Sequence, residues 1–312
     1  MDHSIVGICQ IFNEIEKGNL ERFIDNISPY VTELVVYDDG STDGSYEHLK
    51  KHTKYILRSD RNEFCNEISH KEQLVQVAKG LNPDFILWLD ADEVLSKNAL
   101  HELPKLCNYC IENNIDGVSF QELNLWRSNS WKRIDNLYND GWFVRLWRVT
   151  PDLHYDTKKS GLHQTPYPDT IKNIIKNDTI KVIHYGFFSD EAIARKFITY
   201  RKYGQKGFLL YRFLEEKGIK LEKVSKEVFP SDLWFDDEPP KRRSIVEALK
   251  FSEITGNKIN NTKEDVSVLL ILDLIDFVKY RTIRNMSKIW MAVLIRIVKL
   301  KKAAEFRLLG ND

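Results

Sequence analysis

The stretch Phe85-Ile-Leu-Trp-Leu-Asp-Ala-Asp-Glu-Val94 joins an apolar run directly to two carboxylates that are one residue apart. An apolar run of this length is typical of a central strand in a parallel sheet that is covered on both faces. At the end of such a strand Asp90 and Asp92 can both reach a hard cation, and Ala91 leaves room beside it. Oxygen ligands of this kind suit Mg²⁺ or Mn²⁺, which often take further oxygens from a phosphorylated substrate. By itself the motif is weak, because acidic residues also cap helices and a helix is predicted to begin soon after it.

Two earlier strands end in the same manner. The apolar run 34–37 leads into Asp38-Asp39-Gly-Ser-Thr-Asp-Gly44, and the run 4–11 leads into Phe12-Asn13-Glu14. Open α/β sheets bind their ligands at the carboxyl ends of the strands, so these polar residues are expected at one edge. Acidic residues suit a phosphate ligand there only through a bridging cation. Carboxylates can otherwise accept hydrogen bonds from a base N–H or from ribose hydroxyls.

These segments carry a resemblance to a known family. Residues 8–14, 33–45 and 89–93 resemble, in order and spacing, the GT-A nucleotide-sugar glycosyltransferases of family 2. Further along, the segment 141–148, the triplet Leu162-His-Gln164 and the triplet His184-Tyr-Gly186 resemble the lipopolysaccharide-core and O-antigen glucosyltransferase branch. The resemblance extends to about residue 205. It implies an α/β GT-A fold, with a Rossmann-like, mainly parallel sheet flanked by helices, and transfer with inversion at the anomeric carbon.

The resemblance also implies roles for particular residues. The donor would be a nucleoside-diphosphate sugar, with a UDP-sugar preferred, and the cofactor Mn²⁺ or Mg²⁺. Donor-binding residues would be Gln10, Phe12, Asn13, Glu14, Asp38, Asp39, Lys71, Asp90, Ala91 and Arg195. Metal ligands would be Asp90, Asp92 and His184. Two alternatives stay open, since His184 at a strand end could be a hydrogen-bonded structural residue and Arg195 could belong to a solvated basic helix face.

The general base is less well defined. His163 occupies a position that the branch resemblance marks as functional, but the next residue in the branch is usually Glu. Here it is Gln164, which cannot take a proton. The candidates for the base are therefore His163, Asp140 and Asp156.

Composition agrees with an enzyme of one large α/β domain and an appendage. The 312 residues include 46 Lys and Arg and 46 Asp and Glu, and the formal net charge of zero argues against a general nucleic-acid binder. Cys107 and Cys110 form a C-x-x-C inside a predicted helix, and no second pair completes a zinc site, so we expect reduced core or surface thiols. No apolar signal segment opens the sequence, and a cytoplasmic location is expected.

The predicted elements alternate, which implies right-handed crossovers and a mainly parallel sheet. Helices are predicted over residues 20–27, 45–52, 67–81, 99–112 and 190–216, and strands over 4–11, 34–37, 55–57, 85–89, 117–122, 143–147 and 181–183. The polar segment 124–142 is a candidate acceptor loop. We expect a catalytic domain over 1–225, a Pro-containing linker over 226–244 and a helical region over 245–312.

The end of the chain is basic. Residues 279–307 hold nine Lys and Arg against one acid, and their longest apolar run, 289–295, is far too short to span a bilayer. An amphipathic helix here could lie on an anionic membrane surface, where a lipid-linked acceptor would be found. Packing against the catalytic domain, or against a second copy in a homo-oligomer, is the alternative.

The sequence thus predicts a metal-dependent inverting glycosyltransferase that acts on a hydroxyl of a glycan or glycolipid acceptor. A nucleotidyltransferase acting on sugar phosphates is one alternative, but it usually needs a Gly-rich, basic first loop, and residues 10–18 hold one glycine. A catalytically inactive nucleotide-sugar or glycan-binding module is the other, and the intact Asp-x-Asp argues against it.

Overall fold

The computed structural model describes residues 3–63, 66–135, 141–158, 167–202, 219–230, 232–241 and Ile275. The chain divides into two compact units. The first comprises Met1–Ile193 and Lys217–Arg242, and the second comprises Ala194–Glu216 and Arg243–Asp312. Every described strand belongs to the first unit, as does every predicted site residue except Arg195.

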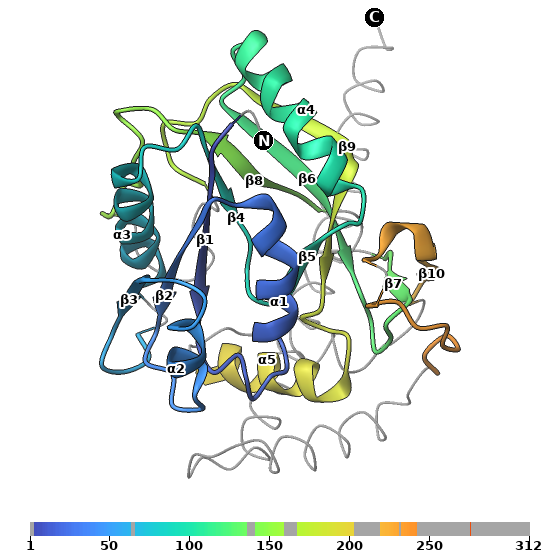
Figure 1. Ribbon diagram of the computed structural model, residues 1–312. Coiled ribbons are helices and arrows are strands. Elements are labelled where there is room, and N and C mark those ends of the chain that lie inside the picture. Colours follow the sequence, from blue (N-terminus) through green and yellow to red (C-terminus); the bar gives the residue numbers. More distant parts are fainter. Residues whose placement is uncertain are drawn as a thin grey trace, which may run out of the picture. The chain divides into compact units, whose positions relative to one another are not determined.

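The first unit is built on an eight-stranded sheet with the strand order β3-β2-β1-β4-β8-β6-β9-β5 (Figure 1). The strands are β1 (Ile5–Ile11), β2 (Glu33–Asp38), β3 (Tyr55–Arg58), β4 (Phe85–Trp88), β5 (Glu93–Leu95), β6 (Gly117–Asn124), β8 (Trp142–Arg148) and β9 (Ile174–His184). Strands β3, β2, β1 and β4 run parallel, and β6 is parallel to β9. Strand β8 is antiparallel to both β4 and β6, and β5 is antiparallel to β9. The predicted α/β fold with a mainly parallel sheet is confirmed.

Helices bury both faces of the parallel strands (Figure 1). Helices α1 (Leu20–Ile27) and α4 (Ala99–Glu112) cover one face, and α3 (Glu67–Gly80) covers the other. The other helices are α2 (Ser45–Leu49), α5 (Asp190–Lys202) and the short 3-10 helix η1 (Ser28–Tyr30) after α1. Alternate residues of a strand point to opposite faces. Accordingly Cys9 of β1 packs in one core cluster with α1 and α4, whereas Ile8 packs in another with α3.

A second, two-stranded sheet pairs β7 (Trp131–Arg133) with β10 (Leu221–Lys223), and the 3-10 helix η4 (Lys226–Val228) follows. Phe229 is buried in a cluster with Leu125 and Tyr185. Asp237 accepts hydrogen bonds from Ser128 Oγ at 2.8 Å and from the Asn129 N–H at 3.0 Å. The segment predicted as a linker from residue 226 is therefore packed onto the first unit as far as residue 241, because its apolar and acidic side chains have partners there.

Two further expectations bear on function. Cys107 and Cys110 lie on the buried side of α4, where burial raises the pKa of Cys107 to about 12 and that of Cys110 to about 11, so both are inert core thiols. Among the described residues, no helix is long and apolar enough to span a bilayer. The predicted basic helix over 279–307 lies outside the described residues.

Candidate active site

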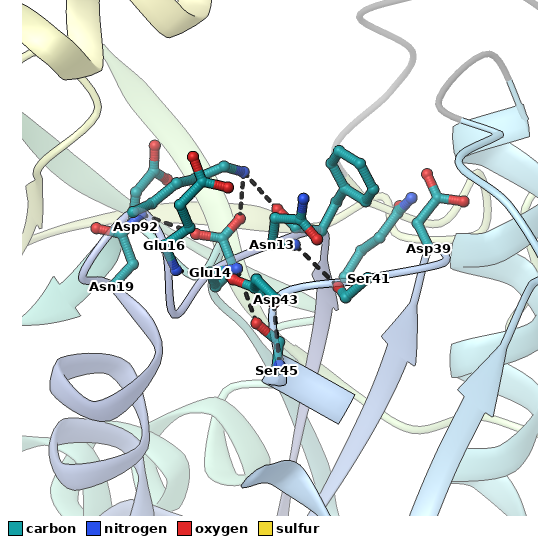
Figure 2. Close-up of polar contacts among 12 residues, drawn as sticks. Asn13, Glu14, Glu16, Asn19, Asp39, Ser41, Asp43, Ser45 and Asp92 are labelled. Atoms are coloured by element: carbon teal, nitrogen blue, oxygen red, sulfur yellow. Dashed lines mark hydrogen bonds and ion pairs between the residues drawn. The ribbon is translucent and has the colours of Figure 1, made fainter. Parts of the chain in front are cut away.

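The loops that follow β1 and β2 are hydrogen-bonded to each other at the carboxyl edge of the sheet (Figure 2). The Asn13 N–H donates to Ser41 Oγ at 2.9 Å, and the Thr42 N–H donates to Asn13 Oδ1 at 2.8 Å. Asp43 accepts from the Glu16 N–H at 2.7 Å. Asn13 has a φ of 54°, in the left-handed region that Asn tolerates better than most residues. The sequence places Asn13 at this turn, and the structure shows that it joins the two loops.

Glu14 lies in the same pair of loops, but its carboxylate is already bound. Its oxygens accept from Lys17 Nζ at 2.7 Å and Asn19 Nδ2 at 2.8 Å, and the residue is 7 % exposed. Lys17 Nζ also donates to the Phe12 carbonyl at 2.6 Å. The predicted direct role of Glu14 in donor binding is therefore not supported by its position, since it shapes the loop from within.

The adjacent carboxylates Asp38 and Asp39 have different surroundings. Asp38 is fully buried, where it accepts from the Ser41 N–H at 3.1 Å and lies 3.1 Å from Arg58 Nε. These partners hold the Asp38 carboxylate within the loop, and its predicted contact with a nucleoside stays a prediction. Asp39 points from the opposite side of the chain and belongs to a separate network.

Asp39 accepts three hydrogen bonds: from Ser59 Oγ at 3.0 Å, from Asn62 Nδ2 at 3.2 Å and from the Glu63 N–H at 2.9 Å. A carboxylate has about four acceptor positions, of which these hydrogen bonds use three. Asp39 is 1 % exposed, nearly as buried as Asp38. Burial raises the pKa of Asp39, although these hydrogen bonds oppose the shift. Beside this network His70 stacks on Tyr37 with ring centroids 4.0 Å apart.

His70 also contacts Gln10, whose Nε2 lies 3.0 Å from the His70 Nδ1. Burial lowers the pKa of His70, and the carboxylates of Asp39 and Glu63 oppose this shift. A neutral ring is therefore favoured near pH 7. Our sequence analysis did not select His70, because a histidine on the buried face of a helix carries no motif.

Asp90, the first carboxylate of the Asp-x-Asp, is held by two side chains. Its Oδ1 accepts from Trp88 Nε1 at 3.0 Å, and its Oδ2 lies 3.3 Å from Arg145. Arg145 also binds Glu93 and lies 3.8 Å from Glu122. Burial alone would lower the pKa of Arg145, but these three carboxylates raise it, so its charge is permanent. One buried cation thus faces three acids.

Asp92, the second carboxylate, lies on the other side of the turn and faces His184. Asp92 Oδ2 is 3.3 Å from His184 Nε2, and His184 Nδ1 is 2.7 Å from Asn124 Oδ1. The register places Glu93 of β5 opposite His184 of β9, which brings residue 92 to the histidine. Among the described residues no group of three or more His, Cys, Asp or Glu is arranged to hold a metal ion. Of the three predicted metal ligands, Asp92 and His184 contact each other. Asp90 instead contacts Trp88 and Arg145.

Comparison with known proteins agrees with this geometry. Residues 8–122, which run from β1 into β6, match the model of glycosyl transferase family 2. This part of the chain is thus similar to a family 2 glycosyltransferase domain. The match and the strand order agree with the GT-A-like α/β fold and with the glycosyltransferase class expected from the sequence. The match ends before the motifs that suggested the lipopolysaccharide-core branch.

Solved structures similar to this chain include S. aureus TarS, with 12% sequence identity, a TM-score of 0.40, and coverage of 68% of this chain and 42% of that chain. The S. aureus TarS fragment 1–349 gives 12% identity, a TM-score of 0.39, and coverage of 69% and 72%. Its complex with UDP-GlcNAc gives 12% identity, a TM-score of 0.39, and coverage of 68% and 73%. The chain thus spans less than half of the longer TarS chain. No curated protein matches the sequence significantly.

Two residues assigned to the donor are buried away from the polar edge of the glycosyltransferase domain. Lys71 is 4 % exposed, pairs with Glu67 and lies over the Trp88 ring at 5.0 Å, so it supports Trp88. Ala91 is also 4 % exposed and packs in the apolar cluster of α1 and α4. The assignment of both residues to the donor stays a prediction.

The described contacts do not test the remaining predicted residues. Asp156 accepts from the Lys158 N–H at 3.1 Å, and its own N–H donates to Asp169 at 2.8 Å. Asp140 and His163 lie outside the described residues. Arg195 belongs to the second unit. Their assignments stay predictions.

A cation that the sequence analysis missed lies on α1. The Arg22 guanidinium stacks over the Tyr185 ring at 3.8 Å and donates to Asn19 Oδ1. Tyr185 is tied to the Asp-x-Asp turn, since its N–H donates to the Asp92 carbonyl at 2.7 Å. Burial lowers the pKa of Arg22, and Tyr185, Asp92 and Glu14 oppose the shift. A positive charge therefore lies on the Asp92 side of the edge.

Proposed function

We propose that this protein transfers a glycosyl group from a nucleoside-diphosphate sugar, with a UDP-sugar preferred, to a hydroxyl of a glycan or glycolipid acceptor. The main support is that two separate sets of polar groups lie at the strand ends of a domain that matches family 2. Asp39 lies at the end of β2, and Asp92 with His184 lies at the ends of β4 and β9. The Asp39 carboxylate, which only accepts hydrogen bonds, suits an N–H of the base or an O–H of the ribose. The pair of Asp92 and His184 suits the diphosphate.

The side chains of Asp92 and His184 fit a divalent cation. A carboxylate oxygen and an imidazole nitrogen 3.3 Å apart can bind one Mn²⁺ or Mg²⁺, leaving several positions for waters and diphosphate oxygens. When bound, such an ion would neutralise the leaving diphosphate. Asp90 would orient the turn through Trp88 and Arg145 instead of binding the ion directly.

The reaction proposed is a direct displacement with inversion. The acceptor oxygen forms a bond to the anomeric carbon, the bond from that carbon to the diphosphate breaks, and the acceptor proton passes to a base. His163, Asp140 and Asp156 remain the candidates for this base. The lipopolysaccharide-core branch, a lipid-linked acceptor and a membrane surface contact through residues 279–307 also remain proposals.

Donor binding tests this function most directly. We would titrate UDP, GDP and a panel of nucleotide sugars by calorimetry, with Mn²⁺ and with EDTA, into the wild type and Asp92→Asn. Asp92→Asn should lose the Mn²⁺-dependent part of nucleotide binding, whereas Asp178→Asn, at an exposed position of β9, should behave as the wild type. Equal binding by Asp92→Asn and wild type in Mn²⁺ would contradict the metal role, and no nucleotide binding by the wild type would contradict the function.

A further inference from the structure

Strands β8, β6 and β9 are neighbours in the sheet, and they bring one aromatic and three polar side chains together (Figure 1). Their registers pair Gln121 of β6 with Trp142 of β8 and with Lys181 of β9. Lys176 Nζ, also of β9, lies 5.1 Å from the centre of the Trp142 ring, and Lys181 Nζ lies 6.0 Å from it. We call these residues the Trp142 cluster.

The Trp142 cluster lies at the same edge of the sheet as the candidate active site. Strand β8 runs antiparallel to β4, with Leu146 opposite Leu87, so its first residue, Trp142, lies beyond the carboxyl end of β4. The Asp-x-Asp turn follows that same end. Two residues further along β8, Val144 packs in one core cluster with Trp88, whose Nε1 donates to the turn. The cluster can therefore contact a molecule whose reacting end lies near the Asp-x-Asp turn.

The side chains of the cluster are rich in hydrogen-bond donors. Lys181 Nζ donates to Gln121 Oε1, which fixes the amide so that its nitrogen keeps two N–H donors. Among the described residues, neither Trp142 Nε1 nor Lys176 Nζ has a hydrogen-bond or carboxylate partner. Lys176 is exposed, and Trp142 and Gln121 are half-buried, so a ligand can reach them from solvent. A ligand that accepts hydrogen bonds and carries negative charge is complementary to these groups.

A basic surface that only faces water would have a different arrangement. Like charges repel, so lysines without a ligand would gain from keeping apart. Here both ammonium groups lie beside one indole, which attracts cations through its ring face. The indole also offers a ligand an apolar surface and one N–H. A sugar ring with an acidic substituent matches this combination, because it has C–H groups, hydroxyl oxygens and a negative charge. Free phosphate would not use the indole, and a neutral sugar would not use the lysines.

From these contacts we propose that the Trp142 cluster binds a sugar of the acceptor glycan that bears a phosphate or a carboxylate. Trp142 contacts the sugar ring, Lys176 and the Gln121 amide bind the anionic group, and Lys181 orients Gln121. This inference rests on the proposed function, because a glycan held at this edge would present a hydroxyl to the donor.

Calorimetry on the full chain tests the charge of the ligand. The probes are tetragalacturonate, its methyl ester, which lacks the charges, glucose 6-phosphate and inorganic phosphate. The wild type should bind tetragalacturonate more tightly than its methyl ester, and glucose 6-phosphate more tightly than inorganic phosphate. Binding of both charged sugars should weaken as salt rises, because salt screens exposed charges.

Substitutions then assign the binding to the cluster. Lys176→Gln should weaken tetragalacturonate binding about 2–5-fold, the range typical of an exposed ion pair, and Lys176→Arg should retain it. Trp142→Leu should weaken it about 10-fold, because a buried tryptophan contact often dominates an interface, and should leave inorganic phosphate binding nearly unchanged. Lys54→Gln is the matched control, since Lys54 is also exposed and its Nζ lies 5.0 Å from the centre of the Tyr55 ring.

UDP binding separates this site from the donor site. It should be the same in Lys176→Gln and in the wild type, and a parallel loss of UDP would assign the cluster to the donor and overturn the proposal. The proposal also fails if the wild type binds neither charged sugar, if the methyl ester or inorganic phosphate binds as tightly, or if Lys176→Gln behaves like Lys54→Gln. If charged sugars bind through Lys176 but no nucleotide sugar binds the wild type, the sugar site stands and the proposed function fails.

Discussion

Arg145→Met should destabilise the first unit strongly, because Arg145 is the cation that Asp90, Glu93 and Glu122 share. Its removal leaves the buried Glu93, which is 1 % exposed, without a counter-charge. Breaking a buried pair by removing one partner typically costs about 3–5 kcal/mol. For a domain of this size, each kcal/mol lowers the melting temperature by about 2–4 °C. Differential scanning calorimetry near pH 8 should therefore show a decrease of about 6–20 °C.

The effect should depend on pH in one direction. Burial raises the pKa of Glu93 well above its usual value even in the wild type, although Arg145 opposes the shift. Without Arg145 the pKa of Glu93 rises further, so the folded variant holds a proton that the unfolded chain releases at lower pH. Stability from this group is fully present below the unfolded pKa and is lost as pH rises through the folded pKa. The deficit of Arg145→Met should thus be smaller at pH 6 than at pH 8.

A double substitution and a control complete the test. Adding Glu93→Gln to Arg145→Met should recover much of the loss, since the uncompensated charge is then absent. Arg148 lies on the same strand and donates a hydrogen bond to the neutral Asn114 at 3.0 Å. Arg148→Met should therefore lower the free energy of unfolding by about 1 kcal/mol or less. The reasoning is refuted if Arg145→Met costs no more than Arg148→Met, or if its deficit is the same at both pH values.

Three shorter predictions concern binding. Asp39→Ala should weaken the binding of UDP and of UDP-sugars alike by about 10–100-fold, because a hydrogen bond to a charged group is worth about 1.5–3 kcal/mol. If calorimetry finds that only the affinity for the acceptor has changed, Asp39 does not bind the nucleoside. Arg22→Met, which keeps much of the packing on Tyr185, should weaken the binding of UDP more than the binding of uridine. An equal effect on both would exclude a role of Arg22 at the diphosphate. If residues 279–307 bind anionic vesicles, the fraction of protein that sediments with the vesicles should fall steeply as salt rises, because each Lys or Arg near the surface contributes about 1 kcal/mol. A fraction that does not depend on salt would exclude electrostatic binding of these residues to the membrane surface.

Much of the sheet was predictable, because β1, β2 and β4 are mostly apolar and lead into polar residues. Helices α1 and α4 were predicted with their observed bounds. The three residues of β5 carry no pattern of their own. Strand β9 begins at Ile174, earlier than predicted, because its residues 176–179 are polar and have the composition of a turn.

The site was only partly predictable. Asp38 and Asp39 are consecutive residues at a strand end, and alternation along β2 could have shown that they face opposite ways. Arg145 could not be identified, because its three acidic partners come from β5, β6 and the Asp-x-Asp turn. The contact of His184 with Asp92 depends on the pairing of β5 with β9. These are long-range registers, which local sequence patterns do not determine.

The Arg145 cluster accounts for the different roles of two carboxylates that are almost adjacent in sequence. Asp90 shares the charge of Arg145 and receives a hydrogen bond from Trp88, so its negative charge is largely compensated. Asp92 faces the His184 ring, with Nε2 3.3 Å from Asp92 Oδ2. In the proposed function a cation at this edge would therefore bind Asp92 and not Asp90. We therefore propose that Asp90 fixes the turn and that Asp92 binds the ion. Asp92→Asn should then remove the Mn²⁺ dependence of nucleotide binding, while Asp90→Asn should chiefly disturb the turn.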